Sequence, residues 1–145
     1  CVVAADGLSA YALERNLGPL LFAFIPKLHE HNLSASPLCL VKGGRVAVGD
    51  EIGQRLTSNV AVVCIGERPG LSSTDSLGVY MTFDPKIGRT DESRNCISNI
   101  RSEGLKPHFA AEKLLYLIKK SLQMQCSGVQ LKDESDPRLG NAQVW

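Results

Sequence analysis

The chain has 145 residues, of which 43% are hydrophobic and 21% charged, and this fits one globular domain with a single core. Sixteen basic and fifteen acidic residues give a net charge of +1, and no basic stripe is present, so we predict no nucleic-acid partner. The longest apolar runs, such as residues 60–65, are far too short to cross a bilayer, so we predict no membrane partner.

The five cysteines favour a reducing compartment over a metal site. They stand at Cys1, Cys39, Cys64, Cys96 and Cys126, widely spaced and without a C-x-x-C pair, so we expect no metal ligands among them. An odd number of unpaired thiols is typical of cytoplasmic proteins. We therefore expect the protein in the cytoplasm.

The first residues predict a core strand followed by a long helical segment. Residues 2–5 are apolar, and residues 6–9 form a turn in which Ser9 suits a helix N-cap. A helix is predicted over residues 10–31, with an interruption near Gly18-Pro19 and a kink or second break at Pro26. Because a chain rarely begins inside its own sheet, we expect the natural protein to carry a segment before this strand.

The middle of the chain predicts three strands and one short helix. Residues 37–41 are apolar, residues 45–48 are apolar after Arg45, and a glycine turn separates the two predicted strands. A short helix is expected from Gly49 to about residue 57, with Asp50 as its cap. Residues 60–65 are apolar without polar alternation, which favours a strand buried on both faces.

The remaining elements end with the clearest helix of the chain. Residues 66–76 are rich in Gly, Ser and Pro and predict a loop, which a strand over residues 78–83 follows. A short helix or turn is predicted over residues 94–100. In residues 107–124 apolar side chains recur at i, i+4 and i+7, and the proline at the start suits a first helical turn.

Alternation of short apolar runs with helical segments predicts an α/β fold. We expect a Rossmann-like three-layer domain over residues 1–136, with a mostly parallel sheet flanked by helices, and a polar tail over residues 137–145. In open sheets of this kind, ligands bind where the loops leave the strand ends.

Four polar, glycine-containing segments stand out as candidate binding regions: residues 5–10, 44–50, 66–73 and 94–101. The first and third directly follow apolar strands, and none has the pattern of a phosphate loop. The segments offer backbone, Asn and Ser groups but no complete acid–base set. This inventory favours ligand binding, and we predict no catalytic residue.

The side chains in these segments also have structural interpretations. Asp6 and Ser9 suit a turn and a helix cap, while Glu67 and Arg68 suit an exposed ion pair. Cys96 has no obvious base beside it and suits an inert thiol. Two other functions stay open on these residues: a stand-alone α/β domain that binds a nucleotide or similar small ligand, and a thiol-dependent enzyme that uses Cys96.

Long strings spread over nearly the whole chain resemble the small (light) subunit of ethanolamine ammonia-lyase. They are ADGLSA at 5–10, PLL at 19–21, GRVAVGDEIG at 44–53, IGERPGLSSTDSLG at 65–78, RNCISNIR at 94–101 and SGVQLKDESD at 127–136. Strings of this length are much more specific than a short motif. Members of that family begin with an N-terminal segment that is absent before ADGLSA here.

The resemblance implies a function that the residues alone do not reveal. Enzymes of this family convert ethanolamine to acetaldehyde and ammonia with adenosylcobalamin, and the large subunit is a TIM barrel that holds the substrate. The small subunit forms one wall of the cobalamin site. The family's corrin contacts match Val46, Glu67 and Cys96, which we expect to offer a main-chain group, a carboxylate acceptor and a thiol at the ring periphery.

The resemblance also implies partners and a binding mode for the cofactor. We expect the large subunit as partner, a higher hetero-oligomer, and no activity from this chain alone. No Asp-x-His-x-x-Gly string is present, which implies base-on cobalamin with dimethylbenzimidazole kept on the cobalt. Members of the family occur free in the cytoplasm or inside bacterial microcompartments.

Overall fold

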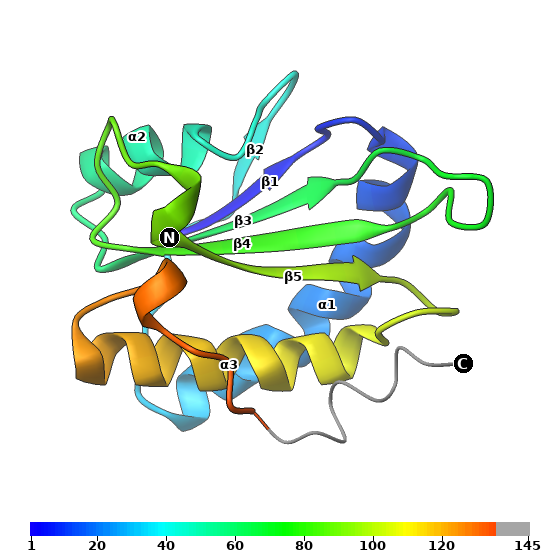
Figure 1. Cartoon of the computed structure of the whole chain (residues 1–145). Coiled ribbons are helices and arrows are strands. Elements are labelled where there is room, and N and C mark those ends of the chain that lie inside the picture. The colour runs from blue at the N-terminus through cyan, green and yellow to red at the C-terminus, as the bar shows by residue number, and fades with distance from the viewer. Residues whose placement is uncertain (136–145) are drawn as a thin grey trace.

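A computed structural model describes residues 1–135, in which five strands form one sheet in the order β2-β1-β3-β4-β5 (Figure 1). The predicted polar tail over residues 137–145 lies outside the described residues. The strands are β1 (Val2–Ala5), β2 (Cys39–Val41), β3 (Val60–Gly66), β4 (Leu77–Phe83) and β5 (Arg94–Ile100). The helices are α1 (Ala10–Glu30), α2 (Val48–Arg55) and α3 (Pro107–Met124), with single 3-10 turns at Asp91–Ser93 and Gly128–Gln130.

The sheet is mixed, and the prediction of a mostly parallel sheet is wrong. β1 pairs in parallel with β2 and β3, whereas β4 pairs antiparallel with both β3 and β5. A parallel crossover needs a long connection, usually a helix, and such helices join β1 to β2 and β2 to β3. The connection from β3 to β4 contains no helix, so the chain returns beside β3 in the opposite direction.

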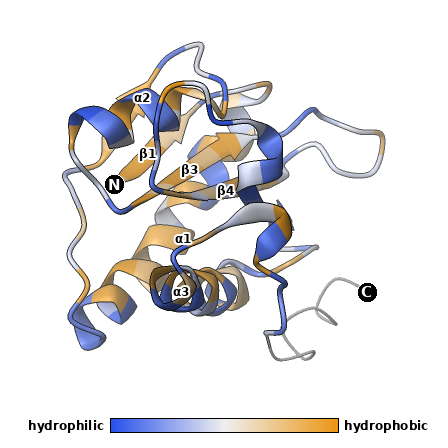
Figure 2. Cartoon of the chain, turned by 60° about the vertical axis from the view of Figure 1, so that its left-hand side comes forward, coloured by the Kyte–Doolittle hydropathy of each residue, from blue (hydrophilic) through white to orange (hydrophobic). Residues whose placement is uncertain are grey.

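Helices α1 and α3 pack together against one side of the sheet, here called the helix side (Figure 1). The main core lies between them and the strands, and β1 and β3 are hydrophobic throughout (Figure 2). Its largest fully buried members include Leu20, Phe24, Leu77, Met81, Ile100, Leu105, Leu114 and Leu117. Burial of this apolar surface supplies the main driving force for folding.

The opposite side of the sheet, here called the open side, is only partly covered. α2 packs on β3 there, over a small cluster built on Val3, Ala5, Val63 and Ile65. Within residues 1–135 no α-helix packs over β4 and β5 on this side (Figure 1). There Tyr80 is half-buried and Cys96 is exposed. The α/β prediction is confirmed, whereas the Rossmann-like three-layer arrangement is not.

Three local predictions are wrong: the strand over residues 45–48, the cap at Asp50, and the helix or turn over residues 94–100. Residues 45–47 form a turn into α2, not a strand, and Asp50 lies inside the helix instead of capping it. Residues 94–100 form strand β5, not a helix or turn. Ile97 and Ile100, three residues apart as on a helix, both reach the helix side because a β-bulge puts one extra residue between them.

Helix α1 is continuous, so the predicted interruption at Gly18-Pro19 and the break at Pro26 are wrong. Its buried residues Leu20 and Phe24 hold the helix on the sheet, while both prolines are exposed on its outer face. The predicted N-cap is confirmed, since Ser9 Oγ accepts a hydrogen bond from Ala12 N at 3.1 Å. α3 has the bounds predicted from its periodicity. None of the helices within residues 1–135 is long and apolar enough to span a bilayer.

Candidate open-side binding surface

The three predicted contact residues all come from segments on the open side of the sheet. Val46 packs against the apolar cluster there, in the turn before α2. Glu67 directly follows β3, and Cys96 lies on β5 opposite Tyr80 of β4. Tyr80 also pairs with Val63, a member of the open-side cluster. Because directly paired residues of antiparallel strands share a face, Cys96 and Tyr80 both face the open side.

Glu67 is held against the sheet by residues at the start of β4, namely Ser76 just before the strand and Gly78 within it. Ser76 Oγ donates to Glu67 Oε2 at 2.7 Å, and Glu67 N donates to Ser76 O at 2.9 Å. The carboxylate lies over Gly78, where a Cβ atom would be only 2.6 Å from Glu67 Oε1. The absence of a side chain at Gly78 therefore creates the space for this carboxylate.

Glu67 Oε1 is the unusual atom of this surface. It is buried, and no donor within residues 1–135 reaches it. Leaving a buried acceptor without a donor costs about 1–3 kcal/mol, and more for a charged group, so such atoms call for an explanation. A donor from a bound molecule would satisfy it.

The side chains of Tyr80 and Cys96 stay neutral near pH 7. Burial raises the pKa of Tyr80 to about 12, helped by the neighbouring Cys96 thiol and the Glu67 charge. Burial also raises the pKa of Cys96, as does the Glu67 carboxylate, while a hydrogen bond from Tyr80 acts in the opposite direction. A reactive cysteine needs a lowered pKa, so the surroundings of Cys96 disfavour a thiol-dependent enzyme.

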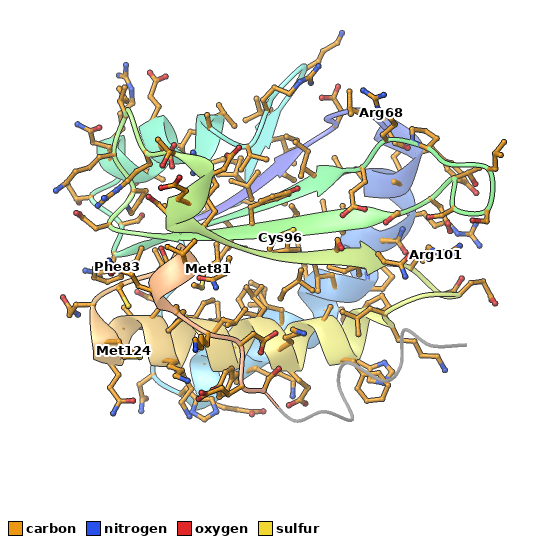
Figure 3. The ribbon with its side chains drawn as sticks, viewed as in Figure 1. Arg68, Met81, Phe83, Cys96, Arg101 and Met124 are labelled. Carbon is orange, nitrogen blue, oxygen red and sulfur yellow. The ribbon has the colours of Figure 1, made fainter. Side chains whose placement is uncertain are left out.

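The structural interpretation holds for Asp6 but not for Glu67. Asp6 Oδ1 accepts from Gly43 N at 2.8 Å and joins the turn after β1 to the turn after β2. Glu67, by contrast, is bonded to Ser76 and makes no ion pair with Arg68, which lies beyond the strand ends (Figure 3). With Asp6 and Ser9 both bonded to the chain itself, the first turn offers no support for nucleotide binding.

The loop that carries Glu67 is anchored by a network that the sequence analysis missed. Asp75 forms ion pairs with Arg15 of α1, where Nε lies 3.2 Å from Oδ2, and with Arg101 just after β5, where Nη1 lies 3.3 Å from Oδ1. Asn16, buried on α1, donates to Asp75 O at 2.7 Å. No local pattern indicates these contacts, because they join residues far apart in the chain.

The open side is a surface and not an enclosed pocket. A cavity of about 550 Å³ lies at the other end of the strands, among residues such as Val2, Phe24 and Asn59, and none of the predicted contact residues lines it. Within residues 1–135 no group of three or more His, Cys, Asp or Glu side chains is placed to hold a metal ion. A ligand on the open side would need a second wall from elsewhere.

Fold and surface define a class: a mixed α/β domain with one partly uncovered sheet face, which carries apolar side chains and a carboxylate with one unsatisfied oxygen among the described residues. The family model of the ethanolamine ammonia-lyase light chain (EutC) matches residues 1–132. The chain belongs to the ethanolamine ammonia-lyase light chain family.

Three relatives, all ethanolamine ammonia-lyase small subunits, support this membership. The protein from Azotobacter vinelandii is 53% identical over 135 residues, which cover 93% of this chain and 50% of the relative. The protein from Pseudomonas fluorescens SBW25 is 54% identical over 134 residues, with 92% and 48% covered. That from Xanthomonas campestris is 51% identical over 140 residues, with 96% and 52% covered. The chain spans about half the length of these curated relatives.

Proposed function

We propose that this chain is part of the small subunit of an adenosylcobalamin-dependent ethanolamine ammonia-lyase and forms one wall of its cobalamin site. Family membership supports the enzyme, and one structural observation supports the wall: the buried Glu67 Oε1 has no donor within residues 1–135. A corrin carries amide groups around its edge, and an amide N–H is the donor that this oxygen needs.

The other two predicted contacts fit the same ligand. The carbonyl oxygen of Val46 already accepts a hydrogen bond from Gly49 N at 3.1 Å. We therefore assign the backbone N–H of Val46 as the donor to a corrin amide oxygen. Cys96 is exposed and neutral, which suits van der Waals contact with the ring periphery. The Tyr80 ring lies between Glu67 and Cys96 and adds an aromatic surface that the sequence analysis did not single out.

Bound adenosylcobalamin supplies the radical chemistry that converts ethanolamine to acetaldehyde and ammonia. The residues of this chain hold and orient the ring. Tyr80 and Cys96 keep their protons because the pKa of each is raised, and the role of Glu67 is to accept a hydrogen bond. No proton transfer is assigned to them. The catalytic residues belong to the large subunit, and this chain alone is inactive.

The arrangement of the chain also supports its partner and the binding mode of the cofactor. A ligand on the uncovered part of the open side needs a second protein wall. We assign this wall to the large subunit, in a higher hetero-oligomer. The histidines of the chain, His29, His31 and His108, lie on or next to α1 and α3, which pack on the helix side. None of them is placed to replace the cofactor's own base, which supports base-on cobalamin. We place the enzyme in the cytoplasm, free or within a microcompartment.

Replacing Glu67 in the full-length small subunit, assembled with the large subunit, tests this function. Glu67→Ala removes a hydrogen bond to a charged group, worth about 1.5–3 kcal/mol, so adenosylcobalamin affinity should fall about tenfold or more. An absorbance titration of the corrin measures it. Glu30→Ala, at the exposed end of α1, is the control and should leave affinity unchanged. Equal affinity of Glu67→Ala and the wild-type complex would refute the assignment.

A further inference from the structure

A buried ion pair joins α2 to β5 on the open side of the sheet. Arg94 Nη1 and Nη2 each donate to one carboxylate oxygen of Asp50, Oδ1 and Oδ2, both at 2.7 Å, so the contact is bidentate. The side chains are only 4% and 3% exposed. Bidentate pairs of this kind add geometric specificity, because both groups are planar and rigid.

The Arg94 guanidinium has no donor left for a ligand. Beyond the two bonds to Asp50, Nη1 donates to Thr82 Oγ1 at 3.1 Å and Nη2 to Arg89 O at 3.1 Å, while Nε donates to Asp91 Oδ1 at 3.3 Å. Arginine has five N–H groups, and all five therefore have acceptors from this chain. Arg94 acts on its surroundings and not on a bound molecule.

The pair sits between two of the proposed cobalamin contacts. Asp50 lies one helical turn after Val46, and Arg94 lies two residues before Cys96 on the same side of β5. α2 packs on β3, and β4 separates β3 from β5 in the sheet. The ion pair therefore extends across β4, where it also binds Thr82, and connects the segment that carries Val46 to the strand that carries Cys96.

We propose that Asp50 and Arg94 are positioning residues that fix the distance between the Val46 and Cys96 segments and so set the affinity of the wall for cobalamin. This inference rests on the proposed function. A corrin is a rigid ring, so contacts on its opposite edges act together only when the two protein segments keep one spacing. A lysine at position 94 has three donors on one nitrogen and cannot reproduce the planar contact.

The test uses the full-length small subunit assembled with the large subunit. Arg94→Lys and Asp50→Asn should each weaken adenosylcobalamin binding about tenfold or more, while kcat at saturating cofactor changes less than about threefold. Thr82→Val, which removes one of the five hydrogen bonds, keeps the test valid if the other variants fail to assemble, and we expect a loss of about threefold. The matched control is Glu51→Gln, which breaks the exposed ion pair with Arg55 in the same helix.

Cofactor affinity and thermal unfolding together decide between positioning and simple stabilisation. A lowered unfolding temperature with cobalamin affinity within twofold of wild type, in every variant that assembles, would overturn the proposal. Glu67→Ala is measured alongside. If Glu67→Ala weakens binding but the Asp50, Arg94 and Thr82 variants do not, the positioning role fails alone, whereas no effect from any of them means that the proposed function itself fails.

Discussion

Gly78→Ala is the substitution that best tests the position of the Glu67 carboxylate. An alanine methyl at this position would lie 2.6 Å from Glu67 Oε1, 3.2 Å from Cγ and 3.3 Å from Cδ. The backbone at Gly78 has no positive φ, so alanine is sterically allowed there apart from this contact. Because the carboxylate ends a flexible side chain, it should swing away and leave the strand in place.

The expected effects on stability and on cofactor binding differ in size. Overpacking costs about 1–3 kcal/mol, and a side chain that can move keeps the loss near the lower end, at about 1 kcal/mol. The displaced carboxylate would lose the charge-assisted hydrogen bond that we propose it makes to cobalamin, worth about 1.5–3 kcal/mol, which corresponds to about 10- to 150-fold weaker binding.

Chemical denaturation measures the first effect, and an absorbance titration of the assembled enzyme with adenosylcobalamin measures the second. Gly18→Ala is the control, because a Cβ there meets nothing within 4 Å on the exposed face of α1. It should stabilise the protein by up to about 1 kcal/mol and leave binding unchanged. A Gly78→Ala enzyme with wild-type cobalamin affinity would refute the reasoning that the carboxylate must lie over Gly78.

Three further predictions follow from the raised pKa values and from the core. The raised pKa of Cys96 should make its alkylation by iodoacetamide at pH 8 slower than that of free cysteine, and Glu67→Gln should make it faster. Peptide mass spectrometry measures the rates. Equal rates for the wild-type and Glu67→Gln proteins would contradict the role of the Glu67 charge. The pKa of Tyr80 is about 12 in the folded state, against about 10 when unfolded, so its contribution to stability is complete below pH 10 and is lost as the pH rises toward 12. Alkaline unfolding of Tyr80→Phe should lack that loss, and an unchanged profile would count against the burial of this phenol. Leu117→Ala should lower the free energy of unfolding by about 2–5 kcal/mol, whereas Phe22→Ala, at 86% exposed, should change it by less than about 0.5 kcal/mol; similar values for both would contradict the assigned core.

The sequence predicts the elements whose signals are local. α3 has the predicted bounds because its apolar period and its first-turn proline lie within the helix itself. β3 was predicted from its unbroken apolar run, within one residue of its end. The direction of β4 was misjudged although the signal was present: the predicted loop between β3 and β4 contains no helix and is too short for a parallel crossover. β5 was misjudged because a bulge imitates helical spacing.

The candidate site divides in the same way between local and non-local information. Family strings indicated Val46, Glu67 and Cys96, and the structure places all three on segments of one side of the sheet. Gly78 ends one of the family strings, but its place beneath the Glu67 carboxylate, like that of Tyr80 beside Cys96, follows only from the three-dimensional structure. Residues 77–82 alternate between the helix side and the open side, and this pattern places Gly78 and Tyr80 on one face. It indicates their neighbours only when residues 94–100 are assigned as the adjacent strand.

The β-bulge in β5 means that one residue between Ile97 and Ile100 is not needed to orient the strand. Upstream of the bulge, Cys96 and Arg94 face the open side, and downstream of it Ile100 is anchored in the core. Deleting exposed Ser98 would leave Ile97 and Ile100 two residues apart, like their partners Val79 and Leu77, so a regular ladder would keep both isoleucines on the helix side and Arg94 and Cys96 on the open side. Homologous chains should therefore tolerate many residues at position 98 and also a gap of one residue there.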